Sequence, residues 1–158
     1  KTKQERKKMS KVVHPLFLTR GVPGTHDVNL IMQTFNNLKK KKFKSVLIPK
    51  FDKSKDDRAK KTKWLKVRQP PHIIIFEGWC VGAKQQKNEE LKKPINFIEK
   101  KHDSDLEWRK KVNYYLKNSY RKIFQKIDKL IYLKAPSFNH IFEWRLLQEQ
   151  KLKLSGQT

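Results

Sequence analysis

Ile73-Ile74-Ile75-Phe76-Glu77-Gly78 is the stretch that indicates the fold most sharply. Three β-branched residues and a phenylalanine follow Pro70-Pro71, and the run stops at an acid and a glycine. A strand buried on both faces of a parallel sheet has this pattern, because neither of its faces is open to water. We therefore expect residues 73–76 to form a central strand with Glu77 at its carboxyl end.

Other segments predict strands that alternate with helices. Residues 43–48 alternate in polarity and end at Pro49, and the apolar run 130–133 stops before Pro136. The remaining expected elements are a helix over 3–11, a helix over 28–38 behind an Asp27 cap, a loop over 50–63, a short helix over 88–93, a long amphipathic helix over 106–124 behind Asp103-Ser104-Asp105, and a last helix behind Ser137 with Phe138, Ile141, Phe142, Leu146 and Leu147 inward. This alternation predicts an α/β fold with a mostly parallel sheet and flanking helices.

The composition excludes several classes of protein. The 158 residues carry four Trp, four Tyr and nine Phe, which is more than a disordered polyelectrolyte contains. The longest apolar runs are far shorter than the about 20 residues of a membrane helix. A single cysteine, Cys80, excludes an internal disulfide and fits a reducing compartment, so we expect a cytoplasmic protein.

The charge is large but diffuse. The chain has 39 Lys and Arg against 15 Asp and Glu, a net charge of +24, and only seven of the basic residues are arginines. Nucleic-acid readers favour arginine and gather their charge on one face. The lysines therefore have two open interpretations: a compositional bias that fills solvated surface, or a partner that bears phosphate groups.

Three segments are candidates for chemistry, because ligands of open α/β sheets bind beyond the carboxyl ends of the strands. Glu77 could hold a hydrated magnesium ion there. Asp52, Asp57 and Arg58 follow the strand over 43–48, and an Arg beside carboxylates can clamp a phosphate or a carboxylate. Residues 21–27, a glycine-bearing loop, open a helix whose N-terminus attracts anions. Each has an ordinary alternative: an exposed glutamate, a solvated loop or a simple helix cap.

Other catalytic patterns are absent from the sequence. The five histidines lack zinc-ligand spacing, and no cysteine pair joins them. A Cys-His nucleophile pair stays open, although Cys80 beside Trp79 is more typical of a small buried residue. The chain contains neither G-x-S-x-G nor the phosphate loop G-x-x-x-x-G-K-[ST].

The order of four blocks carries a family resemblance. The blocks are Gly21-Val22-Pro23-Gly24-Thr25-His26-Asp27, then Ile48-Pro49-Lys50-Phe51-Asp52-Lys53-Ser54 with Asp57-Arg58-Ala59, then Ile75-Phe76-Glu77-Gly78-Trp79, and Trp144-Arg145-Leu146-Leu147-Gln148-Glu149. Together they resemble the D-glycerate 3-kinase type of P-loop kinase, in the uridine kinase and phosphoribulokinase group, from about Thr2 to Gly156. The resemblance implies a P-loop NTPase fold, ATP and Mg²⁺ as cofactors, and transfer of the γ-phosphoryl group to a hydroxyl of a small substrate.

By position, the resemblance also implies the site residues. They are Glu77, Asp27 and Arg58 as catalytic residues, with Glu77 also on the metal side; His26, Asp52 and Lys53 at the substrate; and Arg145 and Gln148 near the nucleotide. D-glycerate as the acceptor rests on the resemblance alone, and an Arg and Lys pocket suits a small carboxylate or a sugar phosphate equally.

The resemblance further implies a phosphate loop and an acidic pair ahead of the residues that match Lys1, and a helical stretch after Thr158. We therefore expect residues 1–158 to be a single partial kinase domain that lacks the N-terminal Walker A strand-loop-helix and the C-terminal end. We expect the isolated chain to be inactive, because positioned phosphates are essential to phosphoryl transfer. A family member that lost its loop is the alternative.

Two other functions remain open from the residues. A basic RNA-binding protein without enzymatic activity would use its lysines and exposed aromatic side chains. It would leave unexplained the acid after the apolar strand and the aspartate after the glycine loop. A structural subunit that keeps a kinase shape is the third possibility. The kinase reading expects no membrane partner and no specific nucleic acid.

Overall fold

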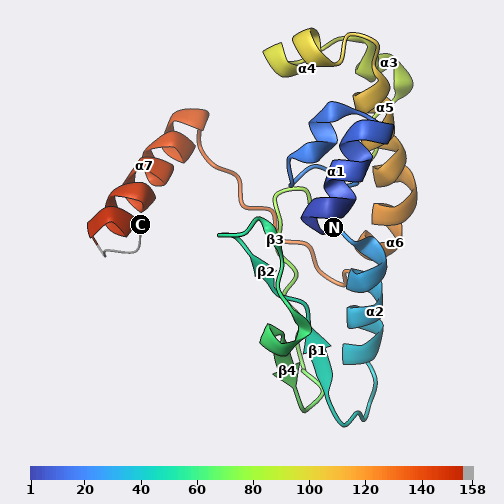
Figure 1. Cartoon of the computed structure of the whole chain (residues 1–158), viewed down its shortest axis with the longest axis vertical. Helices are drawn as coiled ribbons and strands as arrows, with labels where there is room; N and C mark the ends of the chain where they lie inside the picture. The colour runs from blue at the N-terminus through green and yellow to red at the C-terminus, as the bar shows by residue number, and fades with distance from the viewer. Residues whose placement is uncertain (155–158) are drawn as a thin grey trace. The chain divides into compact units, whose positions relative to one another are not determined.

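A computed structural model describes residues 1–154 of the chain (Figure 1). The chain divides into two compact units, Lys1–Asp128 and Lys129–Thr158. Each unit is described by itself. The chain end at residues 155–158, which entered the expected boundaries of the domain, lies outside the described residues. The assignment of residues 1–158 to one partial domain stays a prediction. None of the described helices is both long and apolar enough to cross a membrane.

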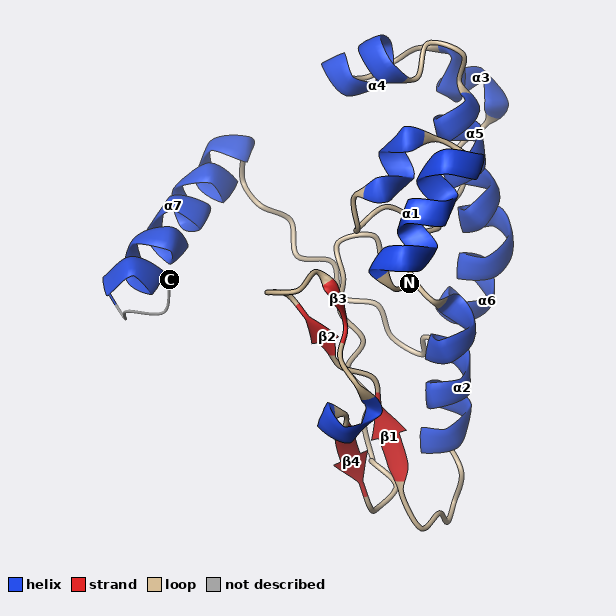
Figure 2. Ribbon diagram, viewed as in Figure 1, coloured by secondary structure: helices blue, strands red, loops and turns tan. Residues whose placement is uncertain are grey.

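The first unit is mainly helical, as Figure 2 shows. Helix α1 begins behind Thr2, whose hydroxyl accepts from the Glu5 amide while the Glu5 carboxylate accepts from the Thr2 amide. Helix α2 begins behind Asp27, as its capping pattern predicts. The helices and helical turns before residue 107 are α1 (Lys3–Val12), η1 (Pro15–Leu18), α2 (Val28–Leu38), η2 (Lys61–Lys63), α3 (Asn88–Lys92) and α4 (Phe97–His102).

The long amphipathic helix is confirmed, with one irregularity. Helix α5 (Glu107–Tyr115) runs through a π-helical turn, η3 (Leu116–Tyr120), into α6 (Arg121–Phe124). Asp103 provides hydrogen-bond acceptors for the free amides in the first turn of α5. Its carboxylate accepts from the amides of Trp108 at 2.7 Å and Arg109 at 3.1 Å. The π-helical turn ends at Tyr120, which packs in the core of the unit.

The mostly parallel sheet is not found among the described residues. Strand β1 (Val46–Ile48) pairs antiparallel with β4 (Leu65–Val67), and β2 (Phe51–Asp52) pairs antiparallel with β3 (Asp57–Arg58). The strand expected over 43–48 is thus real but shorter. The hairpin β2–β3 occupies a segment that its polarity predicts as loop, because short hairpins need few apolar residues.

The run over 73–76 forms no strand in the described structure. Ile73 and Ile75 are 79% and 88% exposed, whereas the alternate positions are half-buried. Phe76 packs edge-on against Phe35 of α2, with ring centroids 5.2 Å apart. A strand exists only when a neighbouring strand accepts its backbone hydrogen bonds, and no described segment does so here. Glu77 therefore does not lie at the end of a buried strand in this structure.

The most deeply buried apolar side chains of the first unit come from η1, η3 and α6, and η1 packs against α5. Phe17 is fully buried, Ile123 nearly so, and the ring of Phe17 packs edge-on against Tyr115 at 6.0 Å. A charged side chain is buried with them: Arg6 of α1 is 1% exposed. A buried guanidinium is tolerated only when its donors are bonded.

The second unit contains helix α7 (Phe138–Leu154), which begins directly after Ser137 as predicted. The strand expected over 130–133 is not formed, and these four side chains are exposed. The apolar face expected to be inward on α7 is also exposed in this unit, from Phe138 to Leu147. An apolar stripe predicts burial only if another element covers it, and a single helix offers no such cover.

Candidate functional site

The glycine loop, residues 21–27, is tightly packed. Pro23, Gly24 and Thr25 are buried, and the Thr25 hydroxyl donates to the Val22 carbonyl at 2.8 Å while accepting from the Gly21 amide at 3.0 Å. Gly24 has a φ of +107°, and a Cβ at this position would overlap the ring of Tyr115. Only glycine fits such a position without strain. The loop therefore holds the start of α2 in a fixed place.

Asp27 joins this loop to the hairpin β2–β3. Its Oδ1 accepts from the Leu30 amide at 3.1 Å, which caps α2, and its Oδ2 accepts from Nη2 of Arg58 at 2.7 Å. Partial burial opposes ionisation of Asp27, but the Leu30 amide and the Arg58 guanidinium outweigh it and lower the pKa of the carboxyl. Asp27 is thus a carboxylate at neutral pH.

Arg58 has unused donors beside this pair. Its side chain is 25% exposed, and Nη2 also lies 3.9 Å from the Glu5 carboxylate of α1. Among the described residues, Nε and Nη1 of Arg58 donate no hydrogen bond. A guanidinium held at one nitrogen and open at the others can bind an anionic oxygen.

Asp52 and Lys53 lie on the same hairpin but do not join the ion pair. The Asp52 carboxylate accepts from the amide and the hydroxyl of Ser54, at 3.1 and 2.6 Å. These contacts, the Ser54 hydroxyl foremost, lower the pKa of Asp52. Lys53 is exposed at the turn. Both side chains therefore border the site without a described contact to Asp27 or Arg58.

His26 precedes Asp27 and contacts a residue far along the chain. Its Nδ1 lies 2.6 Å from the Tyr120 hydroxyl, which also accepts from the Gly24 amide at 2.9 Å. Burial foremost, with the positive charge of Arg20 acting in the same direction, lowers the pKa of His26 to about 4. His26 is therefore neutral at physiological pH.

Glu77 is exposed and has neither an ion pair nor a hydrogen bond among the described residues. Its segment nevertheless approaches the glycine loop, because a Cβ on Gly21 would lie 3.6 Å from the indole nitrogen of Trp79. The structure brings Asp27 and Arg58 into direct contact, and His26 directly precedes Asp27 in the chain. It shows no contact of Glu77 with either member of the pair.

Arg145 and Gln148 lie on α7 in the second unit. Nη1 of Arg145 donates to Oε1 of Gln148 at 3.0 Å, and Nη2 lies 2.5 Å from the Glu149 carboxylate. The Trp144 to Glu149 block thus forms a local polar network on one helix face. Its role near a nucleotide stays a prediction.

Sequence reasoning missed the buried arginines. Arg6 donates to the carbonyls of Leu18 at 3.1 Å and Asp56 at 2.9 Å, and it pairs with the Asp56 carboxylate. Arg109 similarly binds Asp103, through Nε at 2.7 Å, and the Leu91 carbonyl at 3.0 Å. A charged helix predicts a solvated face, and nothing in these stretches distinguishes one arginine from its exposed neighbours.

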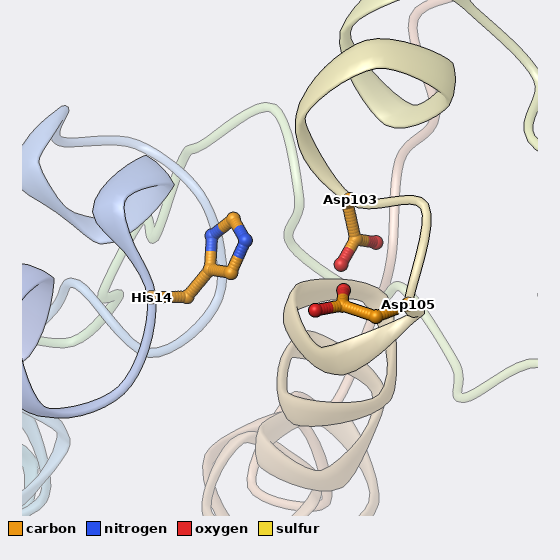
Figure 3. Close-up of side chains that lie close together, drawn as sticks. All are labelled: His14, Asp103 and Asp105. Carbon is orange, nitrogen blue, oxygen red and sulfur yellow. The ribbon is translucent and has the colours of Figure 1, made fainter.

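A second cluster joins η1 to the start of α5. His14 faces Asp103 and Asp105, and ligand atoms of the three lie within 4.8 Å of one another (Figure 3). However, both carboxylate oxygens of Asp103 already accept from α5 amides and from Arg109, and Nδ1 of His14 accepts from the Leu16 amide at 3.2 Å. These atoms are thus already engaged in bonds next to their own elements, and no described hydrogen bond joins His14 to either aspartate.

A cleft lies at the other end of α2. Its volume is about 380 Å³, and it is bordered by α2, β1 and η2. Gln33, Asn37, Lys40 and Trp64 are among the residues that line it, whereas Asp27 and Arg58 are not. The cleft is therefore separate from the ion pair.

Comparison with known proteins finds curated relatives that match most of this chain. No protein-family model matches it. It is 36% identical over 146 residues to the uncharacterized kinase mug58 of Schizosaccharomyces pombe, covering 89% of this chain and 51% of that protein. It is 30% identical over 145 residues to the chloroplastic D-glycerate 3-kinase of Arabidopsis thaliana, covering 88% of this chain and 29% of that protein. The chain thus spans about half, or less, of the curated relatives it matches.

A solved structure of a D-glycerate 3-kinase has a fold similar to that of this chain. The D-glycerate 3-kinase of Cryptococcus neoformans superimposes with a TM-score of 0.77 at 27% identity, covering 98% of this chain and 57% of that structure. The shared architecture is that of a P-loop kinase fold, although the mostly parallel sheet is not seen in the described residues. By sequence and by fold, the chain is therefore homologous to the D-glycerate 3-kinases and the ATP-dependent kinases related to them.

Proposed function

We propose that the full-length protein is an ATP-dependent kinase that transfers the γ-phosphoryl group to a hydroxyl of a small substrate, with D-glycerate as the acceptor. The observation that carries this proposal is the Asp27–Arg58 pair, which joins two of the four blocks on which the family resemblance rests. It places a carboxylate, and a guanidinium with free donors, on one half-buried surface.

The chemistry assigns a task to each member of the pair. The hydroxyl oxygen of the acceptor forms a bond to the γ-phosphorus, the bond to the β-γ bridging oxygen breaks, and ADP leaves with that oxygen. The Asp27 carboxylate orients the hydroxyl and takes its proton. The free Nε and Nη1 of Arg58 bind the transferring phosphoryl group or the substrate carboxylate, where charge is concentrated.

The donor chemistry of Glu77 fits Mg²⁺. The ion keeps several waters and takes one or two carboxylates together with phosphate oxygens, and Glu77 offers an exposed carboxylate without a described partner. When bound, the metal would neutralise charge on the phosphates. We propose Glu77 as its protein ligand. Arg145 and Gln148 are proposed nucleotide contacts, and Asp52 and Lys53 are proposed to border the acceptor beside His26.

The 158 residues contain no G-x-x-x-x-G-K-[ST] sequence, so they do not supply a phosphate cradle of that kind. We therefore propose that the 158-residue chain by itself does not transfer phosphate. None of the relatives named above is described as an RNA-binding protein, so the comparisons do not support the RNA-binding alternative. The cytoplasmic location stays a prediction from the single cysteine.

The test is acceptor-dependent release of ADP by the purified full-length protein, with D-glycerate, L-glycerate, glycerol and a sugar phosphate offered in parallel. The proposal expects turnover with D-glycerate, a much lower rate with glycerol, which lacks the carboxylate, and a raised Mg²⁺ requirement in Glu77→Gln. Turnover with a sugar phosphate alone would keep the kinase and replace the acceptor. No turnover with any acceptor would remove the enzymatic proposal.

A further inference from the structure

Tyr120 lies beneath the glycine loop, 94 residues along the chain from His26 and on a different element. It is 3% exposed at the end of the π-helical turn η3. Its ring packs edge-on against the imidazole of His26, with centroids 5.8 Å apart, and against Phe124 at 6.0 Å. Its hydroxyl lies between the Gly24 amide and Nδ1 of His26.

The hydrogen bonds around this hydroxyl fix where the protons are. A backbone amide can only donate, so the bond from Gly24 uses a lone pair of the tyrosine oxygen. Among the described residues, Nδ1 of His26 is the one acceptor within reach of the phenolic proton, and a donating Nδ1 would leave this buried O–H without an acceptor, so we assign Nδ1 as the acceptor. A neutral imidazole that accepts at Nδ1 carries its own proton at Nε2. The buried hydroxyl of Tyr120 thus favours the tautomer of His26 whose proton is on Nε2.

The nitrogen that carries this proton is open to solvent. Nε2 of His26 donates no hydrogen bond to any described residue. Trp108 Nε1 is the one buried side-chain nitrogen or oxygen without a partner in residues 1–154. Nε2 of His26 also has no described partner, but it is not one of these buried atoms. The nitrogen of this half-buried ring is therefore accessible to water.

We infer that Tyr120 is a positioning residue that holds His26 as the neutral Nε2–H tautomer, so that Nε2 donates a hydrogen bond to an oxygen of the acceptor substrate bound beside Asp27 and Arg58. The inference rests on the proposed function for the identity of that ligand, a carboxylate or hydroxyl oxygen. The tautomer itself rests on the geometry alone.

The surroundings keep both groups in these protonation states. Burial is the main cause that lowers the pKa of His26, and the positive charge of Arg20 acts in the same direction. Burial also raises the pKa of Tyr120 to about 12, against the opposing effect of hydrogen bonding from the backbone of Gly24 and of His26; Cys80 and Tyr115 contribute in the raising direction. Neither group changes charge between about pH 5 and 10, so His26 donates without adding a positive charge.

Substitutions of His26 separate the two ends of the ring. The amide of Gln places a donor near the position of Nε2, whereas the shorter Asn reaches only the position of Nδ1. His26→Gln is therefore expected to retain the affinity for the acceptor within about threefold. His26→Asn is expected to raise KM for the acceptor about tenfold with a smaller change in kcat, as loss of one hydrogen bond would.

The decisive test is long-range ¹H–¹⁵N NMR of the histidine side chains in the full-length protein. We expect Nδ1 of His26 to have the shift of an unprotonated ring nitrogen and Nε2 that of an N–H, unchanged from pH 5.5 to 8. Tyr120→Phe should mix the two tautomers while leaving the ring contacts with Phe124. A proton on Nδ1, or titration of His26 near pH 6.5, would overturn the inference even if the kinase is active.

Addition of D-glycerate distinguishes the inference from the proposed function. A shift of the Nε2–H resonance on binding supports the substrate contact, and its absence in a protein that phosphorylates D-glycerate refutes that contact. If the protein has the expected tautomer but no kinase activity, the proposed function is wrong and the positioning of His26 by Tyr120 still holds. If Tyr120→Phe does not fold, the spectrum of the unsubstituted protein still decides the tautomer.

Discussion

Oδ2 of Asp27 and Nη2 of Arg58 lie 2.7 Å apart and join the first turn of α2 to the hairpin β2–β3. The two residues are 31 positions apart in the sequence, and the exposed fractions of their side chains are 28% and 25%. The pair is thus partly shielded from water, where an ion pair is stronger than on an open surface. It is the contact on which both stability and the proposed chemistry depend.

Asp27 has two structural tasks that substitutions can separate. Asparagine also caps helices well, so Asp27→Asn removes the charge and retains the bond to the Leu30 amide. Asp27→Ala removes both and is expected to cost about 1 kcal/mol more in the free energy of unfolding. Urea denaturation of the two variants, each in the presence and absence of Arg58→Ala, measures this difference. Equal stability of Asp27→Asn and Asp27→Ala would contradict the assigned cap.

Gly24 is the loop position that tolerates a side chain least. Gly24→Ala forces a residue with a Cβ into φ +107° and against the Tyr115 ring, so we expect a loss of about 3 kcal/mol. Gly78→Ala is the matched control, because its Cβ would meet only Val81 at 3.1 Å and its backbone is not in the left-handed region. Thermal denaturation compares the two, and a loss at Gly24 no greater than at Gly78 would refute the described loop geometry.

Arg6 is predicted to stabilise the fold rather than to serve as a surface charge. Arg6→Ala leaves the Leu18 and Asp56 carbonyls without their donor, and we expect a loss of about 3 kcal/mol. Lys8→Ala on the exposed face of α1 is the control and should change stability by less than about 0.5 kcal/mol. The free energy of unfolding from denaturant titration tests this, and similar effects of the two substitutions would show that Arg6 is solvated.

The sequence predicts the helices far better than the sheet. The Asp27 cap and the apolar spacing of α2 are local signals, and a helix satisfies its own backbone hydrogen bonds. Residues 73–76 are as apolar as a buried strand, yet strand formation depends on partners elsewhere in the chain. Local pattern specifies the first kind of element and leaves the second undetermined.

The candidate site shows the same division. Asp27, His26 and Arg58 stand out because their blocks resemble a kinase family and flank turns. Tyr120 belongs to an aromatic stripe, a pattern that predicts only apolar packing. Its hydrogen-bond partners lie in a loop 94 and 96 residues away in the sequence, so the pattern does not reveal them. The role of Arg6 is equally difficult to predict from the sequence. Its partner Asp56 lies 50 residues away, in a segment whose polarity predicts a solvated loop.

The pH dependence of stability follows from His26. The folded state lowers its pKa to about 4 from an ordinary value near 6.5, so the unfolded state binds the proton more readily between these values. Stability is therefore complete above about pH 6.5 and falls as the pH drops toward 4. Because the ring is partly exposed, we expect a loss of about 1 kcal/mol.

His26→Gln has no imidazole to titrate and should lack this component. Urea denaturation of both proteins from pH 4.5 to 7.5 measures the difference. The lowered pKa of Asp27 acts at lower pH and does not interfere, because the stability it contributes is lost only below its ordinary value of 3.8. The same slope in both proteins would show that His26 is freely solvated.

Transfer of label from γ-³²P-ATP to D-glycerate by the full-length protein tests the central claim most directly, in the unsubstituted protein, in Arg58→Ala and in Arg68→Ala. Arg68 is exposed and makes no ion pair among the described residues, so it is a matched control. We expect labelled phosphoglycerate from the unsubstituted protein and from Arg68→Ala, and a rate about 100-fold lower from Arg58→Ala. No labelled product, or an equal rate in Arg58→Ala, would contradict the account.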